Sequence, residues 1–203
     1  HGISFKRYFT GDQMREVALA YKQLLVNSGV ELIESPMEQL FLAIHKVFSS
    51  WNSKRAKDYR QIMGISDDWG TAVTVQAMVF GNRSRQSGSG VVFSHSPKLP
   101  GDTIRLWGDF TIGNQGEDVV SGLVKTLPIS EIQKDLEDRE SKTSLETKFP
   151  QIYRQLVSIV QQLIYDGGWN PQEIEFTFEG PEPEELYILQ TRDMITIKQK
   201  EHL

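Results

Sequence analysis

Cysteine is absent from this sequence of 203 residues, and so is any long uninterrupted run of apolar residues. Without cysteine the chain forms no disulfides and offers no thiolate ligands to a metal ion. This fits a reducing compartment, and we expect a cytoplasmic protein. A membrane-spanning helix needs about 20 predominantly apolar residues, and no stretch of the sequence approaches that length. We therefore expect neither a disulfide-stabilised nor a membrane-spanning protein.

Positive charge is also scarce and scattered. Lys and Arg total 22 against 27 Asp and Glu, which gives a formal net charge of -5. Proteins that bind nucleic acid concentrate positive charge on one surface, so the sequence argues against nucleic acid as a partner. An acidic balance does not argue against a nucleotide, because its phosphates are held by a few local donors and by metal ions.

The rest of the composition, 38% hydrophobic and 24% charged, is that of an ordinary folded domain. In the first third of the chain apolar residues recur at helical spacing, and Ser35-Pro36 and Ser53 mark helix starts. From Trp69 onward, β-branched and aromatic runs predict antiparallel strands. We therefore predict an α+β fold. Its parts are a helical segment at 1–68 and a mostly antiparallel sheet with covering helices at 69–203.

Strands, one helix and one loop are expected in the second part of the chain. Residues 130–147 are charged and poor in apolar residues, which predicts an exposed loop that can include a helical turn. Apolar spacing over 152–163 predicts a helix that ends near Gly167-Gly168. The last two strands are joined by residues 180–184 as a hairpin. The expected strands, of which the first is expected to be buried, are 71–80, 91–93, 105–112, 173–179 and 185–191.

The final hairpin carries the most informative polar side chains. Alternation places Glu173 and Glu175 on one face of its first strand, and Gln190 and Arg192 on one face of its second. If these faces coincide, oxygen ligands suited to Mg2+ converge with a guanidinium suited to phosphate. An exposed sheet face with cross-strand charge pairs gives the same pattern and is its more common origin. The pattern alone leaves both interpretations open.

Two glycine-containing segments invite a nucleotide interpretation on their own. Residues 81–90 lack the lysine of a phosphate-binding loop and lead into a strand where a helix should begin, which favours a hairpin connection. Residues 116–122 form a glycine-flanked acidic turn. Its carboxylates could hold ribose hydroxyls or could cap the turn itself, and composition does not separate the two.

A set of longer stretches is more specific than any of these features alone. The stretches are Trp51-Asn52 with Arg55-Ala56, Asp67 to Val73, Val75 to Asn82, Ser87 to Ser94, Asn114 to Gly122, Glu175-Phe176-Thr177 and Leu189-Gln190-Thr191-Arg192. In this order they resemble the pyruvate phosphate dikinase family over most of the chain. The resemblance implies an ATP-grasp fold, in which two α+β lobes hold ATP between them.

The resemblance also implies an activity. In that family ATP and phosphate yield AMP and pyrophosphate while a histidine on a separate swivelling domain is phosphorylated. A barrel domain then passes the phosphoryl group to pyruvate, making phosphoenolpyruvate. No stretch here matches the glycine-rich start of the family's N-terminal lobe, its phosphohistidine domain or its pyruvate-binding barrel. We therefore expect a dikinase fragment that is inactive alone, with ATP and those missing parts of the parent chain as its partners.

Carried over position by position, the resemblance assigns roles to the candidate residues. Glu175 and Gln190 match metal-binding and nucleotide-phosphate residues, and Arg192 matches a phosphate-contacting arginine, so these three are the catalytic candidates. Glu173 stands where the family usually has aspartate and is a nucleotide-binding candidate. ATP and Mg2+ are the expected cofactors. The other nucleotide-binding candidates are Gln76 and Met78, expected beside the adenine, and Glu117 and Asp118, expected near the nucleoside.

Some positions depart from the family pattern. His95 and Lys125 stand where the family usually has arginine, and Asp193 follows Arg192 where it commonly has asparagine. These departures keep open a phosphoenolpyruvate synthase-like enzyme or another dikinase with a different acceptor. A non-catalytic nucleotide-sensing or interaction module is the alternative from another class. Loss of Mg-ATP affinity on substitution of Glu175 or Arg192 would separate the nucleotide site from that module.

Overall fold

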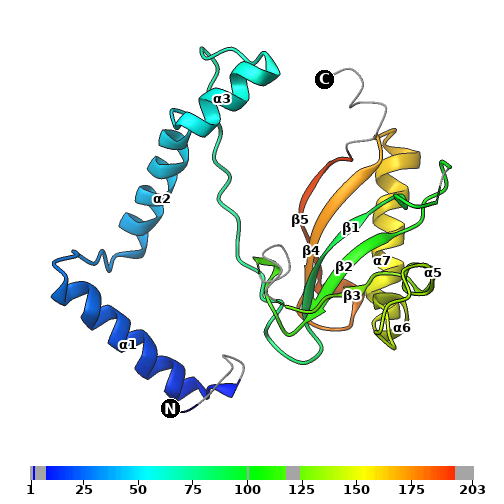
Figure 1. Cartoon of the computed structure of the whole chain (residues 1–203), viewed down its shortest axis with the longest axis horizontal. Coiled ribbons are helices and arrows are strands. Elements are labelled where there is room, and N and C mark those ends of the chain that lie inside the picture. The colour runs from blue at the N-terminus through cyan, green and yellow to red at the C-terminus, as the bar shows by residue number, and fades with distance from the viewer. Residues whose placement is uncertain (1, 3–7, 100, 118–123, 195–203) are drawn as a thin grey trace. The chain divides into compact units, whose positions relative to one another are not determined.

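The chain divides into two compact units, His1–Gln76 and Ala77–Leu203 (Figure 1). The computed structural model describes residues 2, 8–99, 101–117 and 124–194. The predicted division between 68 and 69 into helical and ATP-grasp parts stays a prediction. None of the helices within the described ranges is long and apolar enough to cross a membrane.

The described part of the first unit contains three α-helices, as the spacing of its apolar residues predicted. They are α1 (Gly11–Asn27), α2 (Pro36–Ser50) and α3 (Lys54–Met63). The predicted serine caps are confirmed. Ser35 Oγ accepts a hydrogen bond from the backbone N–H of Glu38 at 3.4 Å, and Ser53 Oγ accepts one from that of Ala56 at 3.2 Å. These bonds satisfy N–H groups that the first helical turn leaves unpaired.

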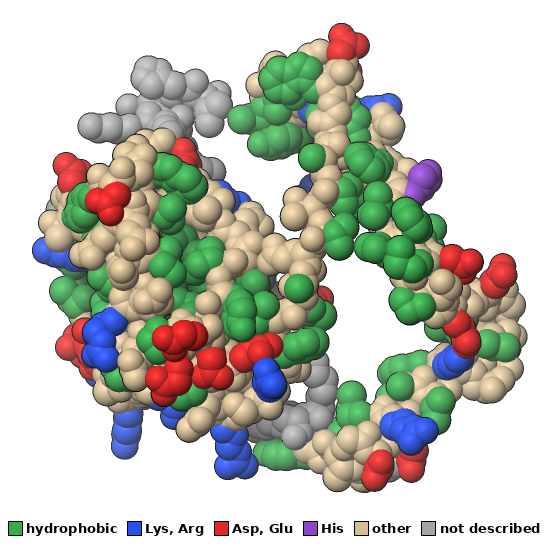
Figure 2. Space-filling model, turned by 180° about the vertical axis from the view of Figure 1, so that it is seen from behind, with side chains coloured by type: hydrophobic (Ala, Val, Ile, Leu, Met, Phe, Trp, Pro, Cys, Tyr) green, Lys and Arg blue, Asp and Glu red, His purple; other side chains and the backbone are tan. Residues whose placement is uncertain are grey.

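Arg60 is the one buried side chain among the described residues of the first unit, with 3% of its surface exposed. Its guanidinium donates to Asp67 Oδ1 at 2.7 Å and to the Trp51 carbonyl at 2.6 Å, and it stacks 4.0 Å above the Trp51 ring. A buried guanidinium is tolerated because these partners replace its water. Hydrophobic side chains, by contrast, are spread along the surface of this unit (Figure 2).

The prediction of a buried strand over residues 71–80 is wrong. This segment has no regular secondary structure, and Val75 and Met78 are 63% and 69% exposed. β-branched and aromatic residues favour a strand only where neighbouring strands and side chains pack against it, and the first strand of the sheet begins later, at Gly88. The N–H of Phe80 donates instead to Glu179 Oε1 at 3.0 Å.

The second unit is built on a five-stranded antiparallel sheet with the order β3-β2-β1-β4-β5. The predicted α+β class is confirmed. β3 pairs with the edge of β2 and is too short to stand out in the sequence. The strands are β1 (Gly88–Phe93), β2 (Trp107–Ile112), β3 (Leu127–Pro128), β4 (Gln172–Phe178) and β5 (Leu186–Asp193).

One face of this sheet packs against α7 (Pro150–Gln161), the helix predicted over 152–163 (Figure 1). A π-helical turn, η2 (Gln162–Asp166), continues α7, and Gly168 follows with a φ of 67° that glycine adopts easily. The core lies at this interface, where burial of apolar side chains stabilises the unit. The core residues are Val92, Leu106, Phe110, Ile129, Leu145, Phe149, Ile152, Leu156, Val160, Ile174, Phe176 and Phe178.

The prediction for residues 130–147 is wrong about an exposed loop, although the helical turn that it allowed is present. The segment folds into α5 (Glu131–Leu136) and most of α6 (Leu145–Lys148), and it buries Gln133 and Leu145 completely. These helices carry few apolar residues because polar bonds hold them in place. Gln133 Oε1 accepts from two backbone N–H groups, those of Gly108 and Ile129, both at 3.1 Å.

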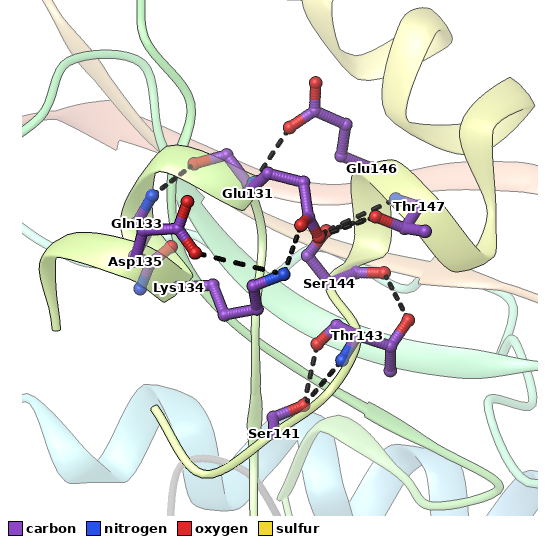
Figure 3. A network of polar contacts seen from close by, with 10 residues as sticks. Glu131, Gln133, Lys134, Asp135, Ser141, Thr143, Ser144, Glu146 and Thr147 are labelled. Carbon is purple, nitrogen blue, oxygen red and sulfur yellow. Dashed lines mark hydrogen bonds and ion pairs between the residues drawn. The ribbon is translucent and has the colours of Figure 1, made fainter. Parts of the chain in front are cut away.

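Glu131 joins the two short helices (Figure 3). Its carboxylate accepts from Ser144 Oγ at 2.5 Å, from Thr147 Oγ1 at 2.6 Å and from the ammonium of Lys134. Its own N–H donates to Glu146 Oε2 at 2.9 Å. These donors favour the ionised carboxyl, so the bonds from Lys134, Ser144 and Thr147 lower the pKa of Glu131 to about 2.

Candidate functional site

The face of the sheet opposite α7 carries polar side chains, and we call it the polar face. On β4 the residues alternate, with Ile174 and Phe176 in the core and Glu173 and Glu175 only partly buried. Successive side chains of a strand point to opposite faces. The two carboxylates therefore lie on the side that the helix leaves open.

The pairing of β4 with β5 brings the four predicted hairpin residues together. Glu173 pairs with Arg192, and Glu175 pairs with Gln190. Residues directly opposite in an antiparallel pair share a face, with Cβ atoms about 4.5–5.5 Å apart. The four side chains therefore form a compact square on the polar face. The sequence left open whether the two faces coincide, and the pairing shows that they do.

A β-bulge on β5 makes this arrangement possible. The register shifts between Glu175 and Phe176, so that Gln190 and Ile188 are opposite successive residues of β4 and Leu189 is the extra residue. Ile188 packs against the core. Under strict alternation Gln190 would face the same way as Ile188, because a shift of one residue exchanges the faces of a strand. Because of the bulge, Ile188 in the first half of β5 faces the core while Gln190 in the second half faces the polar side.

Glu173 and Arg192 are in direct contact within the square. Arg192 Nη2 donates to Glu173 Oε1 at 2.6 Å, and the side chains are 61% and 19% exposed, respectively. The hydrogen bond and charge of Glu173, with a further contribution from the charge of Glu175, raise the pKa of Arg192. Arg192 is thus a fixed cation whose guanidinium still faces solvent.

The polar face continues from the hairpin onto β1 and β2. Val91 lies opposite Glu175, and Asp109 lies opposite Val91, so the three residues form one row across the sheet. Asp109 Oδ1 accepts from Thr126 Oγ1 at 2.8 Å and lies 3.1 Å from Arg139 Nη1. Val91, which is partly buried, therefore lies as an apolar residue between Glu175 on one side and Asp109 on the other.

Two loops meet at the other end of the polar face, where Ser89 Oγ and Thr177 Oγ1 lie 2.8 Å apart and are buried. Gly81 lies over Ser89 so closely that an added Cβ would come within 2.1 Å of Ser89 Oγ. The N–H of Gly81 donates to Gln115 Oε1 at 3.0 Å. The segments that lead to Met78 and to Glu117 are thereby joined at this end of the face.

The remaining candidates are placed less closely. Met78 and Glu117 are exposed residues of the second unit. Gln76 belongs to the first unit, so its predicted place beside the adenine stays a prediction. Asp118 lies outside the described residues. The structure therefore brings Glu173, Glu175, Gln190 and Arg192 together.

The donor set of the square suits a hard cation shared with phosphate. Within the described ranges, no group of three or more His, Asp or Glu side chains is placed to hold a metal ion by itself. Mg2+ usually binds through one or two carboxylates and completes its shell with water and substrate phosphates. One carboxylate and one amide oxygen beside a guanidinium are a set of that kind.

Sequence reasoning missed two features of this face. The Ser89–Thr177 hydroxyl pair is marked only by the period of two through Ser89, Val91 and Phe93. The Asp109–Arg139 ion pair joins β2 to the segment after α5. Asp109, a charged residue inside an otherwise apolar strand, was the available signal for it.

Comparison with known proteins gives a consistent set of relatives. A family model for the pyruvate phosphate dikinase AMP/ATP-binding domain matches residues 23–162. Pyruvate, phosphate dikinase of Rickettsia conorii is 40% identical over 183 residues, 90% of this chain and 19% of the relative. The Clostridium symbiosum enzyme is 36% identical over 194 residues, 95% of this chain and 20% of the relative. The chloroplastic enzyme of Flaveria bidentis is 35% identical over 193 residues, which are 94% of this chain and 18% of the relative.

The chain spans about a fifth of the length of these relatives. The match to the family model covers well over half of the chain and includes three of the five strands. On this basis the chain belongs to the pyruvate phosphate dikinase AMP/ATP-binding domain family.

Proposed function

We propose that the polar face binds the phosphates of Mg-ATP and that the chain is part of an ATP-grasp domain. The observation that carries the proposal is the pairing of Glu173 with Arg192 and of Glu175 with Gln190 across β4 and β5. The alignment with the Clostridium symbiosum relative supports it, because that alignment covers 95% of this chain, too much to leave the hairpin out.

Glu175 and Gln190 would hold Mg2+ between the protein and the phosphates. The two residues are directly opposite each other on paired strands, and a partly filled coordination shell leaves positions for phosphate oxygens and water. When bound, the ion would neutralise phosphate charge and help to orient the phosphate chain. Glu175 also counters the positive charge of Arg192, which keeps the site from being purely cationic.

Arg192 would contact a phosphate directly. Its guanidinium is 61% exposed while one nitrogen is held by Glu173, so other N–H groups are available to an anion. Glu173 would act as a nucleotide-binding residue by holding this guanidinium over the face. Such a fixed donor stabilises developing phosphate charge without reorganising during the reaction.

The nucleoside would lie toward the Ser89 end of the face. The Gly81–Gln115 bond joins the segments after Met78 and before Glu117 there. We assign Met78 and Gln76 to the adenine, and Glu117 and Asp118 to the neighbourhood of the ribose. These four assignments rest on the family resemblance and are the least constrained part of the proposal.

In the full reaction, the chain would supply the ATP-binding part of a dikinase. The names of its relatives support pyruvate and phosphate as the other substrates. ATP and phosphate would give AMP and pyrophosphate as a histidine of another domain is phosphorylated, and pyruvate would then become phosphoenolpyruvate. In this scheme the chain's own residues place and neutralise the phosphates, and the acceptor is selected elsewhere.

Mg-ATP titration of the 203-residue chain by calorimetry tests the proposal. Arg192→Ala and Glu175→Gln should each weaken binding by about tenfold or more, the usual effect of removing one charged contact to a phosphate or metal. Arg154→Ala and Glu184→Gln are matched controls, because both residues are exposed and Arg154 lies on α7. If all four variants bind Mg-ATP with the affinity of the wild type, an interaction module is favoured over a nucleotide site.

A further inference from the structure

Gln172 is a buried polar residue at the start of β4 that the proposed site does not use. It is 1% exposed, and its side chain lies on the core side of the sheet, next to Glu173 on the polar side. A buried side-chain amide is costly unless its donors and acceptor are all satisfied. The partners of this amide therefore show what it holds in place.

The amide of Gln172 contacts both neighbours of Arg192. Its Oε1 accepts from Thr191 Oγ1 at 2.7 Å, and its Nε2 donates to Asp193 Oδ1 at 2.6 Å. Because side chains alternate along β5, Thr191 and Asp193 point to one side while Arg192 between them points to the other. One amide thus holds the side chains of both residues that flank Arg192.

Further bonds fix Gln172 itself and the carboxylate that it holds. Nε2 of Gln172 also donates to the Asn170 carbonyl at 2.9 Å, and Asn170 Nδ2 donates to Asp193 Oδ2 at 2.9 Å. The backbone N–H of Gln172 donates to buried Ser94 Oγ at 2.9 Å. The donors from Asn170 and Gln172 lower the pKa of Asp193. The clamp is therefore anchored in β4 and in the residue that follows β1.

Such a clamp matters most on an edge strand. Among the described strands β5 pairs only with β4, and Arg192 is the second-last residue of the strand. The ends of edge strands fray easily because their backbone is hydrogen-bonded on one side only. Without the clamp, the guanidinium would move with the end of the strand.

We infer that Gln172 is a positioning residue that holds Arg192 in place for phosphate binding. The inference rests on the proposed function, because it assigns Gln172 a role only through Arg192. It goes beyond a packing role, because the amide grips the two residues that flank the guanidinium. A residue that served only stability would affect folding without a specific coupling to Arg192.

A double-mutant cycle tests the inference, with Mg-ATP affinity of the 203-residue chain measured by NMR titration. Gln172→Leu should weaken binding by about five- to tenfold, within the range of coupling inside one hydrogen-bond network. In the Arg192→Ala background the same substitution should change the affinity less than about twofold, the limit expected for uncoupled sites. Gln133→Leu is the matched control, since Gln133 is also fully buried and bonded to backbone N–H groups. It should lower the melting temperature and leave the affinity unchanged.

Thr191→Val provides a second variant of nearly the same volume if Gln172→Leu does not fold. It removes the hydroxyl from Gln172 Oε1 and should show the same coupling to Arg192, more weakly. If Arg192→Ala weakens binding but the effects of the clamp variants are absent or simply add to it, the inference is wrong and the proposed function stands. If Arg192→Ala itself has no effect, the proposed function fails and takes the inference with it.

Discussion

Glu173 and Arg192 face each other across β4 and β5, and the guanidinium donates to the carboxylate at 2.6 Å. The pair is asymmetric, because Glu173 is mostly buried while Arg192 is largely exposed. The carboxylate thus anchors the arginine and also faces any anion that approaches it. Phosphate binding at this face must therefore work against the charges of Glu173 and Glu175 unless a cation offsets them.

Glu173→Gln should consequently strengthen the binding of metal-free ATP. Removing one facing charge relieves repulsion, while the glutamine oxygen can still accept from the guanidinium and hold it in place. The gain should be roughly two- to fivefold, the scale of an exposed charge pair. In excess Mg2+ the gain should shrink, because the ion already offsets the carboxylates. Titrations in EDTA and in Mg2+ check this, with Glu184→Gln as control. A weaker metal-free affinity in Glu173→Gln would contradict the account.

Glu131 should make the free energy of unfolding of the second unit decrease as the pH falls below about 4.5. Its pKa is lowered to about 2 by the bonds from Lys134, Ser144 and Thr147, below the 4.5 of a free glutamate. A lowered folded-state pKa stabilises the fold above the unfolded value and loses that contribution as pH falls through the folded one. The difference in unfolding free energy between the wild type and Glu131→Gln should therefore shrink between about pH 4.5 and pH 2. Urea unfolding at several pH values measures this, and a constant difference would show that Glu131 is not the ionised centre of the network.

Gly108 should be the least replaceable glycine of the sheet. Its φ is 138°, a conformation that side chains rarely adopt, and an added Cβ would lie 2.2 Å from the Val91 carbonyl oxygen. Gly101 has a φ of 119°, but no atom lies within 4 Å of a Cβ added there. Its substitution therefore measures the cost of the backbone conformation without a steric clash. Gly108→Ala should cost about 2 kcal/mol or more in urea unfolding, and Gly101→Ala about 1 kcal/mol. Equal costs would mean that the contact with Val91 relaxes freely.

Glu179 should hold the segment that precedes β1. It accepts from the Phe80 N–H at 3.0 Å and from Arg83, and these contacts, that of Phe80 most of all, lower its pKa. Glu179→Ala should speed hydrogen exchange of the Phe80 amide by about tenfold, since an exposed bond is worth roughly 1 kcal/mol or a little more. Glu179→Gln keeps the oxygen acceptor and should have a smaller effect. Unchanged exchange in the alanine variant would mean that Phe80 is held by other contacts.

The sequence predicted the parts of this fold that depend on local signals. Alternation along 173–179 and 185–191 predicted the hairpin, the shared face of Glu173 and Glu175, and the shared face of Gln190 and Arg192, because a strand with one buried side shows its period directly. The serine caps of α2 and α3 were predicted for the same reason, since a cap bonds to a residue three positions away.

Features that depend on distant partners could not be predicted in this way. Residues 71–80 have strand-like composition but pair with no strand in the described part of the chain, and residues 130–147 have loop-like composition but bury Gln133 against the backbone of β2. The bulge at Leu189 follows from the need to satisfy the core and the polar face with one strand, which is a property of the whole sheet. The Gln172 clamp joins residues about 20 positions apart and becomes visible only when the strands are paired.

The most direct test of the phosphate site replaces Mg2+ with paramagnetic Mn2+, which accepts the same oxygen ligands. With Mn-ATP added to the 203-residue chain, amide NMR signals of residues 173–175 and 190–192 should broaden selectively. Signals of α7 on the opposite face should persist, and the broadening should disappear in Glu175→Gln. Broadening centred elsewhere, or unchanged by that substitution, would contradict the assignment of Glu175 and Gln190 to the metal and Arg192 to the phosphates.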